Sequence, residues 1–191
     1  MRLFVGLGNP GAQYAMHRHN IGFMALDVIK DMHDFPASRK KFQGHYTEGN
    51  LGSCKTGLLK PETFMNNSGQ AVAAAAKFYK IPADKIVVFH DELDLPPGRV
   101  KIKKSGGTAG HNGLKSIAAH LGTQDFWRVR LGIGHPGDKS KVSGYVLHDF
   151  SKAEQDWLPD FLGKIGNNAE LLFDEKQHSR FIEAVGSAHS A

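Results

Sequence analysis

The feature that most constrains the fold is a run of four apolar residues, Ile86-Val87-Val88-Phe89, which leads directly into His90-Asp91. Because none of the four is polar, neither face of this strand suits solvent, which is typical of a strand inside a sheet that is covered on both sides. The short run Leu3-Phe4-Val5, which ends at Gly6, has the same character. These two strands predict a sheet with helices on both faces.

The rest of the chain alternates between strand and helix patterns. A helix is expected to start near Asn20, a glycine-punctuated hairpin is expected over 42–60, and Ser68 is expected to cap a helix that ends near Lys80. Further strands are predicted at 99–103, 128–131 and 145–147, a helix from the glycine loop to about Leu121, and a helical segment over about 151–185 that opens with the capping box Ser151–Glu154. The pattern predicts a single α/β domain over residues 1–191, a mixed β-sheet flanked by helices on both faces, with a frayed tail at 186–191.

The composition excludes several classes of protein. The 191 residues are 40% hydrophobic and 23% charged, which is typical of a globular chain. No apolar run approaches the roughly 20 residues that a membrane span needs. A single cysteine, Cys54, allows no intramolecular disulfide and no CxxC metal pair, so a reduced, cytoplasmic location is expected. The net charge of +5 is compatible with an anionic partner such as RNA, although alone it is a weak indication.

The glycine-rich segment Gly6-Leu7-Gly8-Asn9-Pro10-Gly11 satisfies the GxGxxG pattern of dinucleotide-binding proteins. Asp27 and Asp31 lie roughly where a ribose-binding acid would be sought. In a true dinucleotide motif, however, the glycines open a helix at once, and here Pro10 turns Asn9 away from helical geometry. A hairpin also replaces the expected second strand that would end in an acid. The nucleotide interpretation is therefore disfavoured.

Polar residues with catalytic potential gather where predicted strands end. Three places carry a histidine beside another polar residue: Asn9 with Arg18-His19-Asn20, then His90-Asp91, then His111-Asn112. Each of these alone is most simply a structural feature, but together they match what ester hydrolysis needs, namely a base, a carboxylate that orients it and donors for the oxyanion. No GxSxG motif is present, so water is expected to be the nucleophile.

Several segments in order along the chain, from the first strand to about residue 150, resemble bacterial peptidyl-tRNA hydrolase. They are Gly6–Gly11, Tyr14, Arg18-His19-Asn20, Lys60-Pro61 with Thr63–Gly69, His90–Gly98, Gly110–Leu114 and Arg130–Pro136.

The resemblance implies a metal-free and cofactor-free enzyme, a monomer, that hydrolyses the ester between a peptide and tRNA. It implies that His19 is the general base, that Asp91 holds His19 in its basic form, and that Asn9 helps to distinguish N-blocked from free aminoacyl groups. The residues implied to bind substrate are Tyr14, Phe64, Met65, Asn66 and Asn112 near the tRNA 3′ end, with Asn66 or Asn112 as oxyanion donor, and Lys103 and Arg130 on tRNA phosphate.

Two alternatives and two departures stay open. A metal hydrolase could draw ligands from His17, His19, His90, Asp91 and His111, although no motif with tightly placed ligands appears in the sequence. A non-catalytic RNA-binding relative could keep the same fold. Thr108 and Ala109 stand where many relatives continue the run of glycines, and alanine at 109 costs of order 1 kcal/mol if that position needs a positive φ. His17 stands where threonine is expected. The basic residues Arg99, Lys101, Lys103, Lys104, Arg128 and Arg130 could form one positive surface beside the glycine loop.

Overall fold

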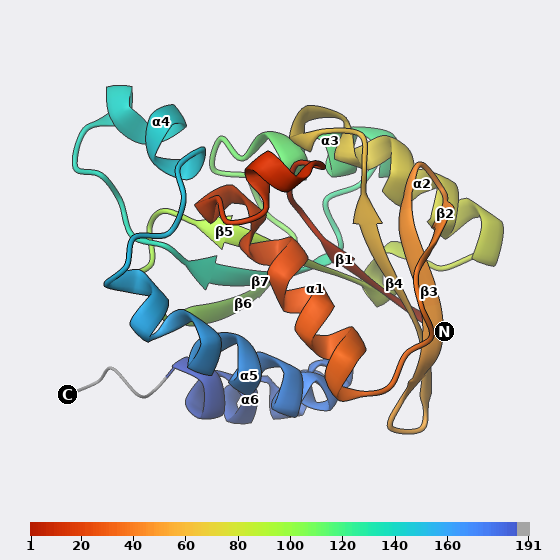
Figure 1. The fold of residues 1–191 in the computed structure, drawn as a ribbon. Helices are drawn as coiled ribbons and strands as arrows, with labels where there is room; N and C mark the ends of the chain where they lie inside the picture. The colour runs from red at the N-terminus through yellow and green to blue at the C-terminus, as the bar shows by residue number, and fades with distance from the viewer. Residues whose placement is uncertain (187–191) are drawn as a thin grey trace.

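Four parallel strands form the centre of a seven-stranded sheet in the computed structural model, which describes residues 1–186 (Figure 1). The strands are β1 (Arg2–Gly6), β2 (Arg39–Lys41), β3 (Gly44–Leu51), β4 (Cys54–Pro61), β5 (Ile86–Glu92), β6 (Val100–Lys104) and β7 (Trp127–Gly132). Their order is β2-β3-β4-β1-β5-β7-β6. The strands β4, β1, β5 and β7 run parallel, whereas β2, β3 and β6 pair antiparallel toward the two edges. The predicted mixed sheet is confirmed.

Helices cover both faces of this sheet, as predicted (Figure 1). They are α1 (Ile21–Met32), α2 (Ser68–Tyr79), α3 (Asn112–Leu121), α4 (Val142–Val146), α5 (Leu158–Asn168) and α6 (His178–Gly186). The alternation along β5 shows the two cores, because Val87 and Phe89 pack with α1, α5 and α6 while Ile86 and Val88 pack with α2 and α3. Within residues 1–186, no helix is both long and apolar enough to cross a membrane.

The segment that follows β1 disagrees with a dinucleotide-binding motif. Two 3-10 turns, Ala12–Tyr14 and Arg18–Asn20, separate the glycines from α1. No helix N-terminus therefore opens at the glycines, where a pyrophosphate would need it. This agrees with the argument from Pro10.

Two local predictions were wrong. Residues 145–147 were predicted to form a strand, but they belong to α4 and the turn after it. In this helical segment Val146 packs into the core and the Tyr145 hydroxyl donates to the Ile133 carbonyl. Ser68 is the first residue of α2 and not its cap, since its hydroxyl donates to the Met65 carbonyl at 2.8 Å.

The C-terminal part follows the predicted pattern. The capping box is present, because the Glu154 N–H donates to Ser151 Oγ at 3.2 Å and the Ser151 N–H donates to Glu154 Oε1 at 3.1 Å. The helices α5 and α6 then lie together along one face of the sheet (Figure 1). Gly186 is the last residue of α6, and the rest of the predicted tail, 187–191, lies outside the described residues.

The first turn of α1 touches the backbone of the sheet. A Cβ placed on Gly22 would lie 2.3 Å from the Phe89 carbonyl oxygen and 2.6 Å from the Leu7 nitrogen, and a Cβ on Gly6 would lie 2.3 Å from the Gly22 oxygen. Only glycine permits so close an approach. Because His19 lies three residues before Gly22, this contact sets the distance between the segment that carries His19 and the end of β5.

Candidate active site

A cleft of about 880 Å3 opens at the carboxyl ends of β1 and β5. Its lining includes most of the predicted site residues, namely Asn9, His19, Phe64, Met65, Asn66, Asp91 and Asn112. Three other predicted residues, Tyr14, Lys103 and Arg130, do not line it. Clefts at the carboxyl ends of parallel strands are the usual binding sites of α/β sheets, which explains why segments far apart in the sequence meet here.

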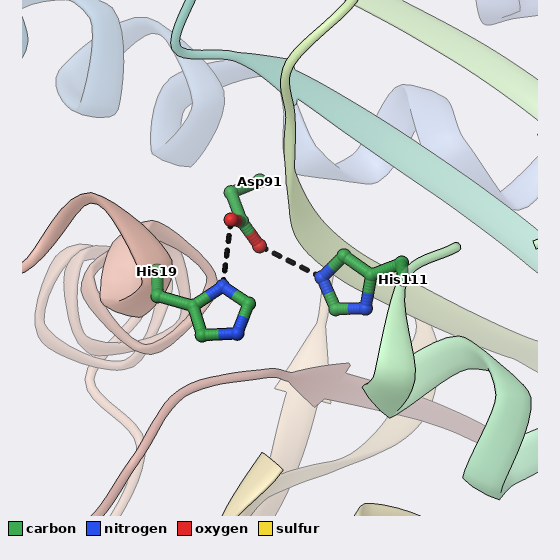
Figure 2. A group of neighbouring side chains, drawn as sticks. All are labelled: His19, Asp91 and His111. Carbon is green, nitrogen blue, oxygen red and sulfur yellow. Dashed lines mark hydrogen bonds and ion pairs between the residues drawn. The ribbon is translucent and has the colours of Figure 1, made fainter. Parts of the chain in front are cut away.

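His19 and Asp91 meet on the floor of the cleft (Figure 2). His19 Nδ1 lies 2.7 Å from Asp91 Oδ2, and Asp91 is only 4% exposed. Burial lowers the pKa of His19, but the charge of Asp91 and the hydrogen bond to it raise that pKa more, so that it lies above 6.5. Burial raises the pKa of Asp91, and the two neighbouring imidazoles, of His19 and His111, outweigh this and hold that pKa far below its usual range.

A second histidine, His111, binds the other oxygen of Asp91 (Figure 2). Its Nε2 lies 2.8 Å from Asp91 Oδ1. The sequence offered His111 only as a possible ligand in the metal alternative and did not predict its contact with Asp91. The contact depends on the folded path of that loop, which local sequence patterns do not describe.

The N-terminus of α3 determines which nitrogen of His111 carries its proton. His111 is the N-cap of that helix, and its Nδ1 accepts hydrogen bonds from the N–H groups of Gly113 and Leu114 at 3.1 and 3.3 Å. A nitrogen that accepts has no proton, so the proton of this ring is on Nε2 and points at Asp91. With the Nδ1 proton of His19 also directed at Asp91, the Nε2 lone pair of His19 is left free, and in Figure 2 this nitrogen points away from Asp91.

The same three residues are also the one group in residues 1–186 that could hold a metal ion. Their ligand atoms lie within 4.8 Å of one another, closer than the sequence had indicated. As a ligand, however, His111 would need a lone pair on Nε2, and it could provide one only by giving up its hydrogen bonds at the start of α3. The hydrogen-bond pattern fits a histidine–carboxylate–histidine relay better than a cation site.

His90 lies beneath this relay. It is 2% exposed, its Nδ1 lies 2.8 Å from the Asp91 carbonyl oxygen, and its ring meets the His111 ring edge-on at 5.0 Å. Burial, and after it the neighbouring His111, lower the pKa of His90 to about 3. His90 is therefore uncharged at neutral pH and supports the ring of His111 by packing.

Asn9 is held by its neighbour Asn20. The amide of Asn20 receives the Asn9 N–H and donates to the Asn9 carbonyl, both at 2.9 Å. The side-chain oxygen of Asn9 accepts the Met65 N–H at 2.8 Å, which leaves the Asn9 side-chain NH2 as the group available to a ligand. No role was predicted for Asn20, whose contribution is to hold Asn9 in position.

Phe64 has a strained backbone. Its φ of 59° and ψ of 159° are unfavourable for a residue with a side chain, yet the residue is 53% exposed on the wall of the cleft. Strain of this kind costs of order 1–3 kcal/mol and persists where the surroundings fix the chain, as the Asn9–Met65 bond does here. The Tyr14 ring lies edge-on to Phe64 at 6.4 Å, so Tyr14 contacts the wall from outside the cleft.

The opposite wall comes from α4 and was not predicted. Val142, Val146 and Leu147 give it an apolar surface. Arg18 anchors it, because its guanidinium donates to Glu154 Oε1 at 2.6 Å and to the Tyr145 carbonyl at 3.0 Å, and lies 4.0 Å from the centre of the Tyr145 ring. The residue next to His19 thus fixes this wall relative to the floor.

A basic surface lies on β6 and β7, beside the cleft. Lys101 and Lys103 are exposed there, and Arg130 shares their face and pairs with Glu92 at 2.8 Å. Arg128 departs from the prediction. It is 1% exposed and donates to the carbonyls of Ser105, Gly107 and Gln124, so it holds the glycine loop from inside instead of adding to the surface.

That glycine loop contains the predicted strain at Ala109. Ala109 has a φ of 49°, in a loop where Ser105, Gly106 and Gly110 also have positive φ values. The loop ends at His111, so its shape determines where the second histidine of the relay lies.

Comparison with known proteins places this geometry in context. The sequence profile described as "Peptidyl-tRNA hydrolase" matches residues 3–189. A peptidyl-tRNA hydrolase of Novosphingobium aromaticivorans is 62% identical over 172 residues, which covers 90% of each chain. Another, of Roseobacter denitrificans, is 60% identical over 185 residues, covering 97% of this chain and 78% of the relative.

The fold agrees with solved structures as well. The crystal structure of peptidyl-tRNA hydrolase from Acinetobacter baumannii aligns with a TM-score of 0.89 and 39% sequence identity, over 98% of this chain and 95% of the other. The sequence resemblance, the fold and the cleft thus agree, and the chain belongs to the peptidyl-tRNA hydrolase family.

Proposed function

We propose that the chain hydrolyses the ester bond between a peptide and the 3′ end of tRNA, with His19 as the base that activates water. The single observation that carries the proposal is the relay in which Asp91 receives an N–H from both His19 and His111. This arrangement leaves His19 Nε2 unprotonated and facing a cleft, which is what a general base requires. Membership of the peptidyl-tRNA hydrolase family supports the choice of substrate.

The reaction follows from the positions of these groups. His19 Nε2 takes a proton from water while the water oxygen attacks the carbonyl carbon of the ester. The bond to the tRNA 3′ oxygen then breaks, and the proton on His19 passes to that oxygen, which gives a free peptide and tRNA. The negative oxygen of the tetrahedral intermediate is stabilised by an amide NH2, for which Asn66 and Asn112 are the candidates because both are exposed in the cleft.

The remaining cleft residues bind the acyl part of the substrate. The free NH2 of Asn9 binds a carbonyl of an N-blocked group, which a free aminoacyl ester does not offer. Phe64, Met65 and the apolar wall of α4 contact side chains near the ester, and Tyr14 supports Phe64. Lys103 and Arg130 bind tRNA phosphate outside the cleft, which positions the tRNA without reading its sequence.

The proposed reaction needs no metal ion and no second subunit. The hydrogen bonds at the start of α3 support a reaction without metal, because they occupy the Nδ1 lone pair of His111. The proposed enzyme acts as a monomer and as one domain, and the single cysteine supports a location in the cytoplasm.

The test is release of the acyl amino acid from N-acetyl-aminoacyl-tRNA by purified protein in the presence of a chelator. An unblocked aminoacyl-tRNA serves as the control. Cleavage of the blocked substrate alone is expected. Folded protein that binds tRNA but does not cleave it would instead support a non-catalytic RNA-binding relative, and activity lost in chelator would support a metal site at the relay.

A further inference from the structure

A second cavity, of about 520 Å3, lies beside the cleft at the carboxyl end of β4. It is bounded by the β2–β3 hairpin and the start of α2. Its lining is polar, and the residues are Lys40, Lys41, Gln43, Gly44, Glu62, Thr63, Asn67 and Gln70. None of the proposed catalytic or tRNA-binding residues is among them.

Four of these side chains are free to bind a ligand. Within residues 1–186, Lys40, Gln43, Asn67 and Gln70 have side chains that make no hydrogen bond or ion pair. Lys41 is different, because its ammonium donates to the Tyr79 hydroxyl at 3.2 Å and lies near aromatic rings. Among the described residues, the cavity therefore presents one free ammonium and three free amides.

The cavity and the cleft share a wall. Along the segment 62–67, Glu62, Thr63 and Asn67 line the second cavity, whereas Phe64, Met65 and Asn66 line the cleft. The two hollows thus adjoin at the carboxyl ends of the neighbouring strands β4 and β1. The exposed Phe64, whose backbone is strained, lies on this shared wall between the two hollows.

The direction in which the substrate lies across the sheet indicates which part of it reaches the second cavity. The basic surface on β6 and β7 lies at one end of the strand order, and the second cavity lies near the other end, with Asp91 on β5 between them. If tRNA phosphate binds to Lys103 and Arg130, the acyl group on the far side of the ester points toward β4. Side-chain amides both donate and accept, as peptide groups do, so the lining suits a polypeptide main chain.

We infer that the second cavity is a subsite for the peptide part of the substrate, several residues away from the ester, where amide side chains bind its main chain and Lys40 binds its carbonyl or acidic groups. The inference rests on the proposed function and adds that binding depends on the length of the peptide. It predicts that the cavity contributes to binding only when the peptide is long enough to cross Phe64.

The test compares two blocked substrates, N-acetyl-aminoacyl-tRNA and a tRNA that carries an N-acetylated hexapeptide. The variant is Lys40→Ala with Gln70→Ala, both exposed, and Lys176→Ala, an exposed lysine that lines neither hollow, is the matched control. Loss of one charged and one amide contact predicts a rise in KM of about tenfold for the hexapeptide substrate. For the short substrate, KM and kcat stay within about twofold of the wild type, as they do for both substrates in the control.

Two results would overturn the inference. An equal rise in KM for both substrates would assign the cavity to tRNA, and no change for either would show that the substrate does not use it. A wild-type protein that cleaves neither substrate would refute the proposed function itself, which keeps the two failures distinct.

A second measurement does not depend on variants. An uncleavable amide-linked analogue with a photoreactive group at the N-terminal residue of the hexapeptide is expected to label 40–43 or 63–70. Labelling confined to α4 would contradict the inference.

Discussion

The floor of the cleft and the basic surface on β6 and β7 lie side by side in the same sheet, yet they are built in opposite ways. On the floor, both oxygens of Asp91 are bound, and the two histidines come from different segments that are themselves fixed by hydrogen bonds or close backbone packing. On the basic surface, Lys101 and Lys103 are exposed, and of these three residues only Arg130 has an ion-pair partner within residues 1–186.

This difference follows from the work proposed for each region. Proton transfer depends on one nitrogen having a lone pair in one direction, which requires groups fixed in advance. Attraction to phosphate depends mainly on charge and tolerates mobile side chains. Substitutions on the floor should therefore change turnover, and those on the surface should change binding.

The largest effect is expected from His19→Ala. Loss of the general base predicts a decrease in kcat of at least about 10²–10⁴-fold, with tRNA binding nearly unchanged. Single-turnover cleavage measures the loss of rate, a titration with tRNA measures binding, and a thermal melt shows whether the variant is folded. A variant that keeps more than about a tenth of the wild-type kcat would show that another group is the base.

The variant Asp91→Asn tests the floor of the cleft through the pH dependence of activity. An asparagine amide would donate to His19 Nδ1 and move the ring proton to Nε2, which predicts a loss in kcat of about 10²–10⁴-fold. The base is active only above its pKa, and Asp91 raises that pKa above 6.5. Activity of the wild type should therefore rise with pH through this raised value, and the residual activity of the variant should begin to rise at lower pH. An unshifted pH profile would contradict the relay.

His111 contacts Asp91 and also caps α3, and two variants separate these two roles. His111→Ala loses the cap of α3 and the contact to Asp91, so stability should fall by about 1 kcal/mol and kcat by about tenfold. His111→Asn is the matched control, because asparagine caps helices well but is too short to bind Asp91. It should recover the stability and not the kcat; recovery of both would mean that His111 is only a cap.

On the basic surface, Lys103→Ala with Arg130→Ala should raise KM for full-length tRNA substrates and leave kcat unchanged. Removal of two phosphate contacts should flatten the slope of log K against log salt by about 1.4–1.8. A minimal 3′-end substrate serves as the control and should respond little. If that fragment were affected equally, the residues would act on the cleft and the contrast between the two regions would fail.

The smallest effect is expected in the loop between the two regions. Ala109→Gly removes the unfavourable φ of 49° and should raise the free energy of unfolding by less than about 1 kcal/mol, because glycine also increases the entropy of the unfolded chain. A denaturant titration measures it. A large loss of stability would show that the alanine methyl group packs in a way that the loop requires.

Sequence patterns predicted those site residues whose positions follow from the strand that precedes them. Asn9 and Asp91 lie just past or at the ends of apolar runs that can only be buried strands, so their meeting at one edge of the sheet followed from the topology. The contact of His111 with Asp91 could not be predicted in the same way, because it depends on a loop with positive φ values and on the cap of α3. The apolar wall was missed because a short helix with valine and tyrosine has the composition of a strand.

The backbone contact at Gly22 has a consequence for how the sequence can vary. A methyl group there would collide with the Phe89 carbonyl and push α1 outward, and the imidazole three residues earlier would move with it. Such a change touches no substrate and alters no charge. Position 22 should nevertheless tolerate substitution as poorly as the residues that perform the reaction, so a mutational scan scored by turnover would detect it alongside them.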